Sequence, residues 1–405
     1  MSNDTRPEIR FPGFTEDWEE RKLGDMMDVT SVKRIHQSDW TNSGIRFLRA
    51  RDIVSAAKNE EPSDYLYISE EKYNEYSKIS GKVSQGDLLV TGVGSIGVPL
   101  LITDDNPIYF KDGNIIWFKN EHKIDGNFFY YSFINNKIQK YIRDVAGIGT
   151  VGTYTIDSGK KTPISLPTYD EQIKIGSFFK QLDHTIALHQ RKLDLLKETK
   201  KGFLQKMFPK NGAKVPEIRF PGFTKDWEER KLGDVFSERS ERSSEGELIS
   251  VTINSGVIKA SELDRKDNSS DNKSNYKKVE VGDIAYNSMR MWQGASGYSS
   301  YEGILSPAYT VIIPKEGTDS KFFAYDFKRY DMIQTFKRNS QGLTSDTWNL
   351  KFPTLKLVKI MVPSIEEQKQ IAAFFERLDN TIALHERELD VLKETKKGFL
   401  QKMLV

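Results

Sequence analysis

Residues 92–97 match the Gly-x-Gly-x-x-Gly pattern, in which a glycine-rich turn lets backbone amides approach the pyrophosphate of a dinucleotide. Asp112 lies about twenty residues after the first glycine, where an acid that binds the ribose is expected. The dinucleotide-binding fold requires a helix after this turn, but residues 98–102 have the composition of a strand. The glycines are therefore predicted to form a hairpin turn and not a nucleotide site.

Asp64, Glu70 and Lys72 follow the order acid, acid, lysine that is typical of metal-dependent nuclease cores. Residues 69–76, however, have the pattern of an amphipathic surface helix, and no strand flanks them. A nuclease site is therefore not predicted.

Other catalytic and metal-binding motifs are missing from the sequence. Gly159-Lys160-Lys161 lacks both the upstream glycine and the following hydroxyl residue of a Walker A loop, and there is no Asn-Pro-Pro-Tyr or Asp-Pro-Pro-Tyr methyltransferase motif. The absence of cysteine excludes disulfides and cysteine-ligated zinc. We expect a non-catalytic chain without a metal site. The five histidines have no metal-binding spacing and are expected at the surface or in a helix seam: His36, His122, His184, His189 and His385.

Side chains suited to a different chemistry, the recognition of DNA bases, gather in polar loops. Arg, Asn, Gln, Ser and Thr hydrogen-bond with base edges, whereas Lys positions phosphates. Arg290 and Trp292 stand out, because residues 289–293 (Met-Arg-Met-Trp-Gln) place an unusual density of contact-prone side chains in one loop. In the first half the candidates are Arg46, Arg49 and Arg51 on one predicted strand, Thr91 and Ser95 on the glycine-rich turn, and Arg143, Thr150 and Thr153 around a second glycine-rich loop. In the second half they are Asn287, Arg290, Trp292, Gln293, Lys337, Arg338, Asn339, Gln341, Thr344 and Ser345.

The composition is that of a folded protein of two or three domains, with 405 residues, of which 37% are hydrophobic. The formal net charge is only +2, so any contact with nucleic acid must come from local patches or from a partner. The first ten residues lack the apolar core of a signal peptide, and no stretch approaches a membrane span. We therefore expect a cytoplasmic protein that does not bind a membrane.

An internal duplication organises the chain. Residues 7–25 return as residues 216–234, and Glu16, replaced by Lys225, is the one difference in these nineteen positions. A second pair, residues 170–207 and 366–403, is identical at 27 of 38 positions. Between these repeats lie two segments that differ in length and largely in sequence, which we call the first cassette (about 26–168) and the second cassette (about 235–364). The pattern predicts one framework that carries two different recognition heads.

The second repeat predicts a long helix in each half. Apolar residues recur at steps of four and three, which is the heptad seam of a coiled coil, and each copy therefore needs a helical partner. We favour an intramolecular antiparallel pair over a homodimeric coiled coil, because pairing within one chain loses less entropy. His189, His385, Lys200 and Lys396 fall on the seam as register-setting or partner-facing residues. The apolar seam positions are Ile175, Phe179, Leu182, Ile186, Leu193, Leu196, Phe203, Ile371, Phe375, Leu378, Ile382, Leu389, Leu392 and Phe399.

Both cassettes have mixed α and β patterns in the same order. Each places a Gly-Asp dipeptide before an apolar strand (Gly86-Asp87 and Gly282-Asp283), then a turn, another strand, a helix and a polar loop. The predicted helices span 69–78 and 127–141 in the first cassette and 321–336 in the second. The fold class is thus α+β, with two similar mixed domains separated by two long helices that pair as an antiparallel coiled coil. The expected divisions are 1–169 (first domain with its repeat arm), 170–215 (central helix and linker), 216–365 (second domain with its arm) and 366–405 (C-terminal helix).

The motifs together resemble the specificity (S) subunit of type I restriction-modification systems, over essentially the whole chain. They are the Glu-Gln-x-x-Ile segments at 171–175 and 367–371, the heptad helices with Leu-Asp, their shared ending Lys-Lys-Gly-Phe-Leu-Gln-Lys-Met, the Gly-Asp strands and the duplication.

The resemblance implies a non-catalytic subunit in which each cassette recognises one half of a bipartite double-stranded DNA site. The helices would hold the cassettes apart and fix the gap. It also implies two methyltransferase (M) subunits, which methylate adenine N6, and motor-nuclease (R) subunits. S-adenosylmethionine, ATP and Mg would be bound by these partners, and no cofactor by this chain. The alternative is a two-headed coiled-coil adaptor that binds proteins and not DNA, which the near-zero net charge favours.

Overall fold

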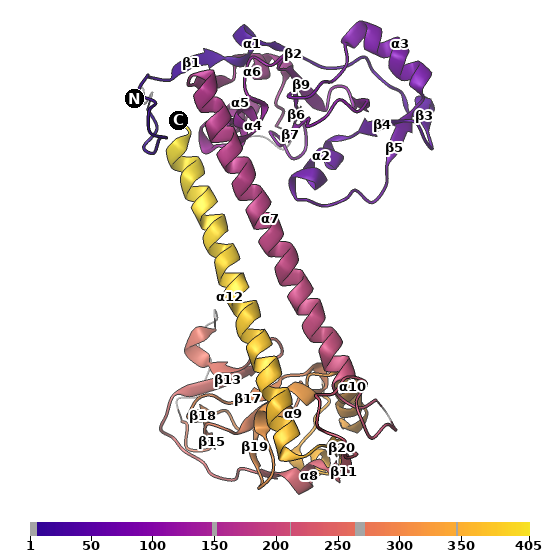
Figure 1. Cartoon of the computed structure of the whole chain (residues 1–405), viewed down its shortest axis with the longest axis vertical. Coiled ribbons are helices and arrows are strands. Elements are labelled where there is room, and N and C mark those ends of the chain that lie inside the picture. Colours follow the sequence, from indigo (N-terminus) through magenta and orange to yellow (C-terminus); the bar gives the residue numbers. More distant parts are fainter. Residues whose placement is uncertain (1–5, 148–151, 211, 264–271, 346) are drawn as a thin grey trace. The chain divides into compact units, whose positions relative to one another are not determined.

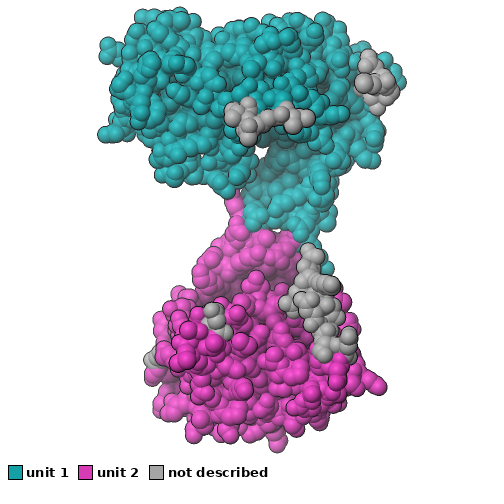
Figure 2. Space-filling view, turned by 180° about the vertical axis from the view of Figure 1, so that it is seen from behind, with its two compact units in different colours: residues 1–190, 387–405 teal, residues 191–386 magenta. Residues whose placement is uncertain are grey.

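The computed structural model describes residues 6–147, 152–210, 212–263, 272–345 and 347–405. It forms two compact units, Met1–Gln190 with Arg387–Val405 and Arg191–Glu386 (Figure 2). Two long helices, α7 (Tyr169–Lys206) and α12 (Ile365–Met403), each contribute one part to both units (Figure 1). The last residues of the chain therefore belong to the same unit as the first cassette.

The first unit contains two four-stranded sheets. One has the order β2-β9-β6-β7 and is antiparallel, and the other has the order β3-β5-β4-β8 with a parallel β4/β8 pair. A short ladder, β1-β10, joins the repeat arm to the end of the cassette. The strands are β1 (Glu19–Lys22), β2 (Asp28–Thr30), β3 (Trp40–Thr41), β4 (Ile45–Leu48), β5 (Leu66–Ile68), β6 (Leu88–Thr91), β7 (Pro99–Leu101), β8 (Ile108–Phe110), β9 (Ile115–Lys119) and β10 (Pro163–Leu166). The shorter helices are α1 (Leu23–Met26), η1 (Gln37–Asp39), α2 (Ala50–Ala57), α3 (Glu70–Ser80), α4 (Gly126–Ile134), α5 (Asn136–Ala146) and α6 (Ile156–Lys161).

The second unit repeats this plan. Its sheets have the orders β12-β19-β16-β17 and β14-β13-β18-β15, again with one parallel pair (β13/β18), and β11-β20 is its arm ladder. This confirms that the cassettes share a fold. The strands are β11 (Glu228–Lys231), β12 (Phe236–Glu238), β13 (Leu248–Thr252), β14 (Gly256–Lys259), β15 (Lys277–Val279), β16 (Ile284–Asn287), β17 (Ser296–Tyr298), β18 (Gly303–Leu305), β19 (Tyr309–Pro314) and β20 (Lys359–Val362). The shorter helices are α8 (Leu232–Val235), η2 (Ala260–Glu262), η3 (Met291–Gln293), α9 (Ser320–Asp326), α10 (Tyr330–Asn339) and α11 (Phe352–Leu355).

The single helices predicted at 127–141 and 321–336 are each divided in two, which corrects the prediction. Asn135 has extended backbone angles between α4 and α5, and its amide donates to the carbonyls of Leu400 and Leu404 at 2.8 and 3.1 Å. Arg329 has the equivalent position between α9 and α10 and donates to the Pro209 carbonyl at 3.1 Å. Both residues thus donate to carbonyls at or just after the end of a long helix, and the local helix is interrupted at each of them.

The Gln of each Glu-Gln-x-x-Ile segment fixes the first helix of its cassette. Gln172 accepts a hydrogen bond from the Asp125 amide at 3.1 Å and donates to Pro167 O, while Asp125 caps α4 by accepting from Phe128 N at 2.9 Å. In the second unit Gln368 and Asp319 make the same contacts with Pro363 and α9. The acidic N-cap accepts hydrogen bonds from amides that have no partner within the helix. The Glu-Gln-x-x-Ile segment therefore lies at the start of a long helix and also positions the first helix of the cassette.

The long helices run antiparallel within each unit. In the first unit the rings of Phe178 (α7) and Phe399 (α12) pack edge to face at 5.2 Å, and in the second Phe203 and Phe374 do so at 5.0 Å. All fourteen predicted apolar seam residues are buried or partly buried. The predicted seam does not contact only the other long helix, however. Phe179, a seam residue, packs on Tyr131 of α4, whereas its neighbour Phe178 packs on Phe399 of α12. The predicted seam therefore faces the cassette near the start of each helix.

A three-residue polar contact ties each cassette to both long helices. Asp183 of α7 accepts a hydrogen bond from the Tyr131 hydroxyl at 2.7 Å and pairs with Lys396 of α12 at 2.5 Å. In the second unit Asp379 has the same partners, the Tyr325 hydroxyl at 2.9 Å and Lys200 at 2.5 Å. Each seam lysine also lies 5.5 Å from the centroid of its tyrosine ring. The contact sets the register of the helices and the orientation of the cassette together.

Candidate nucleic-acid interface

The glycine-rich segment of the first unit is a hairpin turn between β6 and β7, as predicted. The Gly97 amide donates to the Thr91 carbonyl at 2.8 Å, and the Val98 amide donates to the Thr91 hydroxyl at 3.0 Å. The same hydroxyl donates to the carbonyl of Ser95. Thr91 is fully buried, so it shapes the turn and has no exposed surface to offer to a base.

Three neighbouring segments bring the other candidates of this region together. The turn contacts α5 through Gln139, whose amide donates to Gly97 O at 2.9 Å, and it contacts the following loop through Tyr154 N, which donates to Gly92 O at 2.9 Å. Ser95, Arg143 and Thr153 are exposed on these segments. Thr150 lies outside the described residues.

The arginines predicted on one strand belong to different elements. Arg46 is on β4, with its guanidinium 3.9 Å from the Tyr65 ring centroid, whereas Arg49 precedes α2 and Arg51 is within it. Arg49 bonds with Asp52 and Asp64 at 2.8–3.0 Å, and Arg51 also pairs with Asp64. The hydrogen bond from Arg49 to Asp64 is the main factor that lowers the pKa of Asp64, and the charge of Arg51 lowers it further. Arg49 therefore holds the start of α2, and the expected strand ends before it because Asp52 caps the helix.

In the second unit the two candidate clusters, residues 287–293 and 337–345, converge. The Leu350 amide donates to Ser288 O at 2.8 Å, and the rings of Trp292 and Trp348 pack edge to face at 5.2 Å. Lys337, at the end of α10, lies 5.6 Å from the Trp348 ring centroid. Trp348 was not among the predicted residues, although an aromatic side chain in a polar loop is a signal that could have identified it.

The turn after β16 is held by its own side chains. Asn287 accepts a hydrogen bond from Met289 N at 3.0 Å, and the Trp292 indole donates to Met289 O at 3.0 Å. Gly294 ends η3 with a φ of +84°, a conformation that favours glycine. Arg290 is partly exposed, and Asn287 and Gln293 lie beside it on the same turn.

The remaining candidates surround the loop after α10. Arg338 and Asn339 bond back to Thr335 at 3.0 and 2.9 Å, so both are positioned by their own helix. Gln341, Thr344 and Ser345 are exposed on the loop itself. The convergent clusters carry Arg290, Lys337 and Arg338, which makes this a basic, amide-rich surface suited to phosphates and base edges.

Lys328, a partly buried residue beside the end of η3, was not predicted from the sequence. Its ammonium donates to Gly294 O at 2.6 Å, directly after η3, and to Ile253 O at 2.8 Å in the β13–β14 turn. Burial, with a smaller effect of the Lys200 charge, lowers the pKa of Lys328 to about 8. It lines a cavity of about 270 Å³ together with Lys200, Tyr298 and Lys321.

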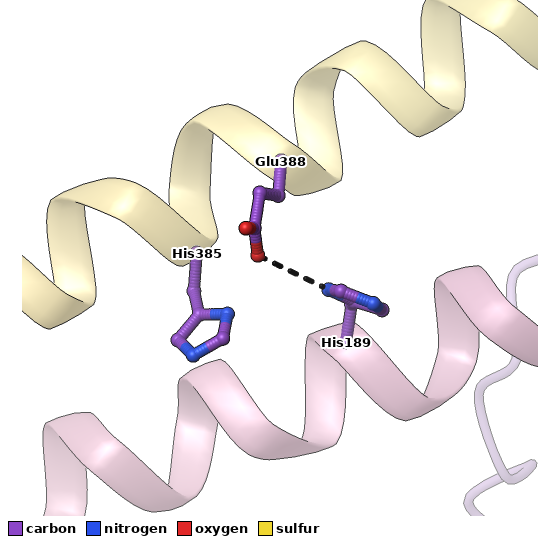
Figure 3. Close-up of side chains that lie close together, drawn as sticks. All are labelled: His189, His385 and Glu388. Carbon is purple, nitrogen blue, oxygen red and sulfur yellow. Dashed lines mark ion pairs between the residues drawn. The ribbon is translucent and has the colours of Figure 1, made fainter.

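The histidines lie in the two kinds of place that the sequence predicted. His36, His122 and His184 are exposed. In the first unit His189 of α7 lies 3.7 Å from the carboxylate of Glu388 on α12 (Figure 3). His385 is buried on α12, three positions before Glu388. As to membranes, none of the helices in the described ranges is both long and apolar enough to cross a bilayer.

Comparison with known proteins gives one consistent family. A family model described as the type I restriction modification DNA specificity domain matches the chain twice, at residues 15–198 and 224–394. The MjaVIII type I restriction enzyme specificity subunit of Methanocaldococcus jannaschii is 23% identical over 429 residues, which cover 98% of this chain and 93% of that protein. A Haemophilus influenzae protein described as a type I restriction enzyme specificity subunit is 32% identical over 163 residues, which cover 40% of this chain and 39% of that protein.

Solved structures show the same fold. The type I restriction-modification S subunit from M. genitalium gives a TM-score of 0.59 at 15% identity, with 99% of both chains covered. The HsdS subunit from Thermoanaerobacter tengcongensis gives 0.51 at 16% identity, again with 99% of both chains covered. Because the family model covers most of the sequence in two copies that coincide with the two halves of the duplication, the chain belongs to the type I restriction-modification DNA specificity family.

Proposed function

We propose that this protein is the DNA-recognition subunit of a type I restriction-modification complex and that each cassette recognises one half of a bipartite target. One observation carries the proposal. The turn after the central strand (β6 or β16), the second helix (α5 or α10) and the described part of the loop that follows lie together in both units, but they present different side chains. Equivalent surfaces with different base-reading groups are what two unlike half-sites require.

The repeated parts of the chain are the proposed platform for the partner subunits. The β1 and β11 strands have the same sequence, Glu-Glu-Arg-Lys, and all eight residues are exposed. Two equal surfaces fit two copies of one methyltransferase subunit, and motor-nuclease subunits would join for restriction. Within this proposal the chain is not catalytic, and S-adenosylmethionine, ATP and Mg are bound by the partners.

The test is to produce the chain with its cognate methyltransferase subunit and to sequence the methylated adenines of the host DNA. A bipartite motif is expected. Replacing residues 235–364 with the cassette of another family member should change one half of that motif and leave the other intact. A change in both halves, or in neither, would contradict the assignment of one cassette to one half-site.

The same preparation tests the adaptor alternative. A complex with the methyltransferase should bind duplex DNA that contains the motif and show a steep dependence on salt concentration, because phosphate contacts release counterions. A complex that assembles but binds no DNA would favour the adaptor.

A further inference from the structure

Leu343 is the most exposed large apolar side chain among the described residues, with a relative exposure of 102%. It lies in the loop between α10 and α11, within the second unit's candidate interface. From residue 337 to residue 345 it is the one apolar side chain, in the sequence Lys-Arg-Asn-Ser-Gln-Gly-Leu-Thr-Ser. An aliphatic side chain therefore stands in water among groups suited to base edges and phosphates.

Backbone and side-chain hydrogen bonds close the loop that carries Leu343. Gln341 and Asn349 exchange backbone hydrogen bonds of 3.0 and 2.8 Å, which close the base of the loop. Thr347 closes its interior, because its hydroxyl donates to Thr344 O at 3.0 Å and accepts from Thr344 N at 3.2 Å. Leu343 thus lies on a loop in which described residues on either side of it hydrogen-bond with one another.

Gly342 makes this geometry possible. Its φ is +149°, and a Cβ at this position would lie 2.6 Å from Thr347 O, closer than real Cβ atoms approach. The Trp292–Trp348 contact and the Leu350–Ser288 hydrogen bond then anchor the loop against the turn that carries Arg290. The loop that carries Leu343 is consequently tied, at Trp348 and Leu350, to the turn that carries Arg290.

We infer that Leu343 contacts the 5-methyl group of a thymine in the half-site recognised by the second unit. This inference rests on the proposed function. In the major groove the thymine methyl is the apolar feature that a base pair offers, and asparagine or glutamine can bond with the adenine opposite. Asn339 and Gln341 flank Leu343 with suitable amides, so the loop carries both halves of a contact that distinguishes an A·T pair.

The experiment uses the complex with the methyltransferase and a set of duplexes in which each thymine of the motif is replaced, one at a time, by deoxyuridine. This change removes only the methyl group. The half-site contains at least one thymine, because the methylated adenine pairs with one. For the unaltered protein we expect one position in the second half-site where deoxyuridine weakens binding about fourfold, from the loss of one buried methyl.

The variant Leu343→Ala should bind the thymine duplex about as weakly as the unaltered protein binds the deoxyuridine duplex, and it should no longer distinguish the two. Leu357→Ala is the matched control, since Leu357 is an exposed leucine (58%) of the same unit outside the loop, and it should keep the fourfold difference. Deoxyuridine effects in the other half-site should be the same in all three proteins, which confirms that the variants are folded.

Two results would overturn the inference. Either no thymine of the second half-site responds to deoxyuridine, or Leu343→Ala retains the full response. Both differ from failure of the proposed function, in which the unaltered complex would show no sequence-specific binding at all.

Discussion

Arg10 and Glu171 form a two-pronged ion pair in the first unit, with Nε and Nη2 of the arginine each 2.7 Å from a carboxylate oxygen. The Glu171 side chain has no exposed surface. Arg219 and Glu367 repeat the pair in the second unit at 2.7 and 2.8 Å. In each unit it joins the repeat arm to the start of a long helix, and the hydrogen bonding of the arginine to the glutamate carboxylate is the main factor that raises the pKa of the arginine.

The variant Arg10→Ala should destabilise the first unit by about 3 to 5 kcal/mol, because it leaves a buried carboxylate without its counter-charge. Hydrogen exchange measured peptide by peptide would show faster exchange in the first unit only. Arg219→Ala should give the mirror image, so each variant serves as the control for the other. Equal loss of protection in both units would contradict this expectation.

The Lys200–Asp379 pair should be coupled more strongly than an exposed pair of the same helices. A double-mutant cycle with Lys200→Met and Asp379→Asn should give a coupling energy of about 1 to 3 kcal/mol, because the carboxylate also accepts the Tyr325 hydroxyl. Lys197 and Glu386, which are 2.7 Å apart and about half exposed, provide the matched control and should give less than about 1 kcal/mol. Similar values for the two cycles would show that the tyrosine contact adds nothing.

The stability of the second unit should rise between about pH 8 and the ordinary pKa of lysine. Since the pKa of Lys328 is lowered to about 8 in the folded protein, the unfolded chain binds more protons in this window, and proton release favours the folded state. Below about pH 8 Lys328 is protonated in both the folded and the unfolded state, and the folded protein has the full free-energy cost of burying the charge. Denaturant unfolding monitored against pH should show this rise, and Lys328→Met should remove it. A rise of equal size in the variant would assign it to another group.

Arg290→Ala should weaken binding by about 1 to 3 kcal/mol and relax one base-pair position, if the guanidinium binds a guanine. The measurement is the affinity of the methyltransferase complex for each single-base variant of the motif. Lys337→Ala is a useful comparison, since a phosphate contact should weaken all sequences alike and reduce the salt dependence. The same uniform loss for Arg290→Ala would make it a phosphate contact.

The long helices are expected to set the gap between the half-sites. Inserting one heptad into both α7 and α12, at matched levels, preserves the seam and lengthens each helix by about 10 Å. At about 3.4 Å per base pair, the methylated motif should gain about two to four unspecified bases. Activity should fall, because about three base pairs also rotate one half-site about the DNA axis. Recovery of an unchanged gap would show that the helices do not set it.

The architecture was predicted well from repeats and periodicity, because both can be read from the spacing of residues in the sequence alone. The hairpin at 92–97, the shared fold of the cassettes and the antiparallel helices all have patterns of this kind. The break at Asn135 was not predicted. Asn135 caps α5 locally by accepting from Lys137 N at 3.1 Å, and its amide also donates to the carbonyls of Leu400 and Leu404, which are distant in sequence. A local helical pattern cannot report such a contact.

The candidate interface was less predictable, because it depends on where side chains point. Arg49 has the right chemistry for DNA, yet its guanidinium is used by Asp52 and Asp64. Thr91 lies on the predicted turn but is buried beneath it. Leu343 and Trp348 were not predicted, because base edges are read mostly by polar side chains, although an apolar side chain in a polar loop is itself visible in the sequence.

The sharing of α12 between the units has a consequence for synthesis on the ribosome. Met403 and Leu404 are buried in the core of the first unit, against the arm and first cassette, and residues 387–405 belong to that unit. At typical rates of about 5 to 20 residues per second, these residues emerge about 10 to 40 s after residue 190. The first unit must therefore stay incomplete while the whole second unit is translated. The second unit would therefore be completed before the first, which reverses the usual order in which the N-terminal domain folds first.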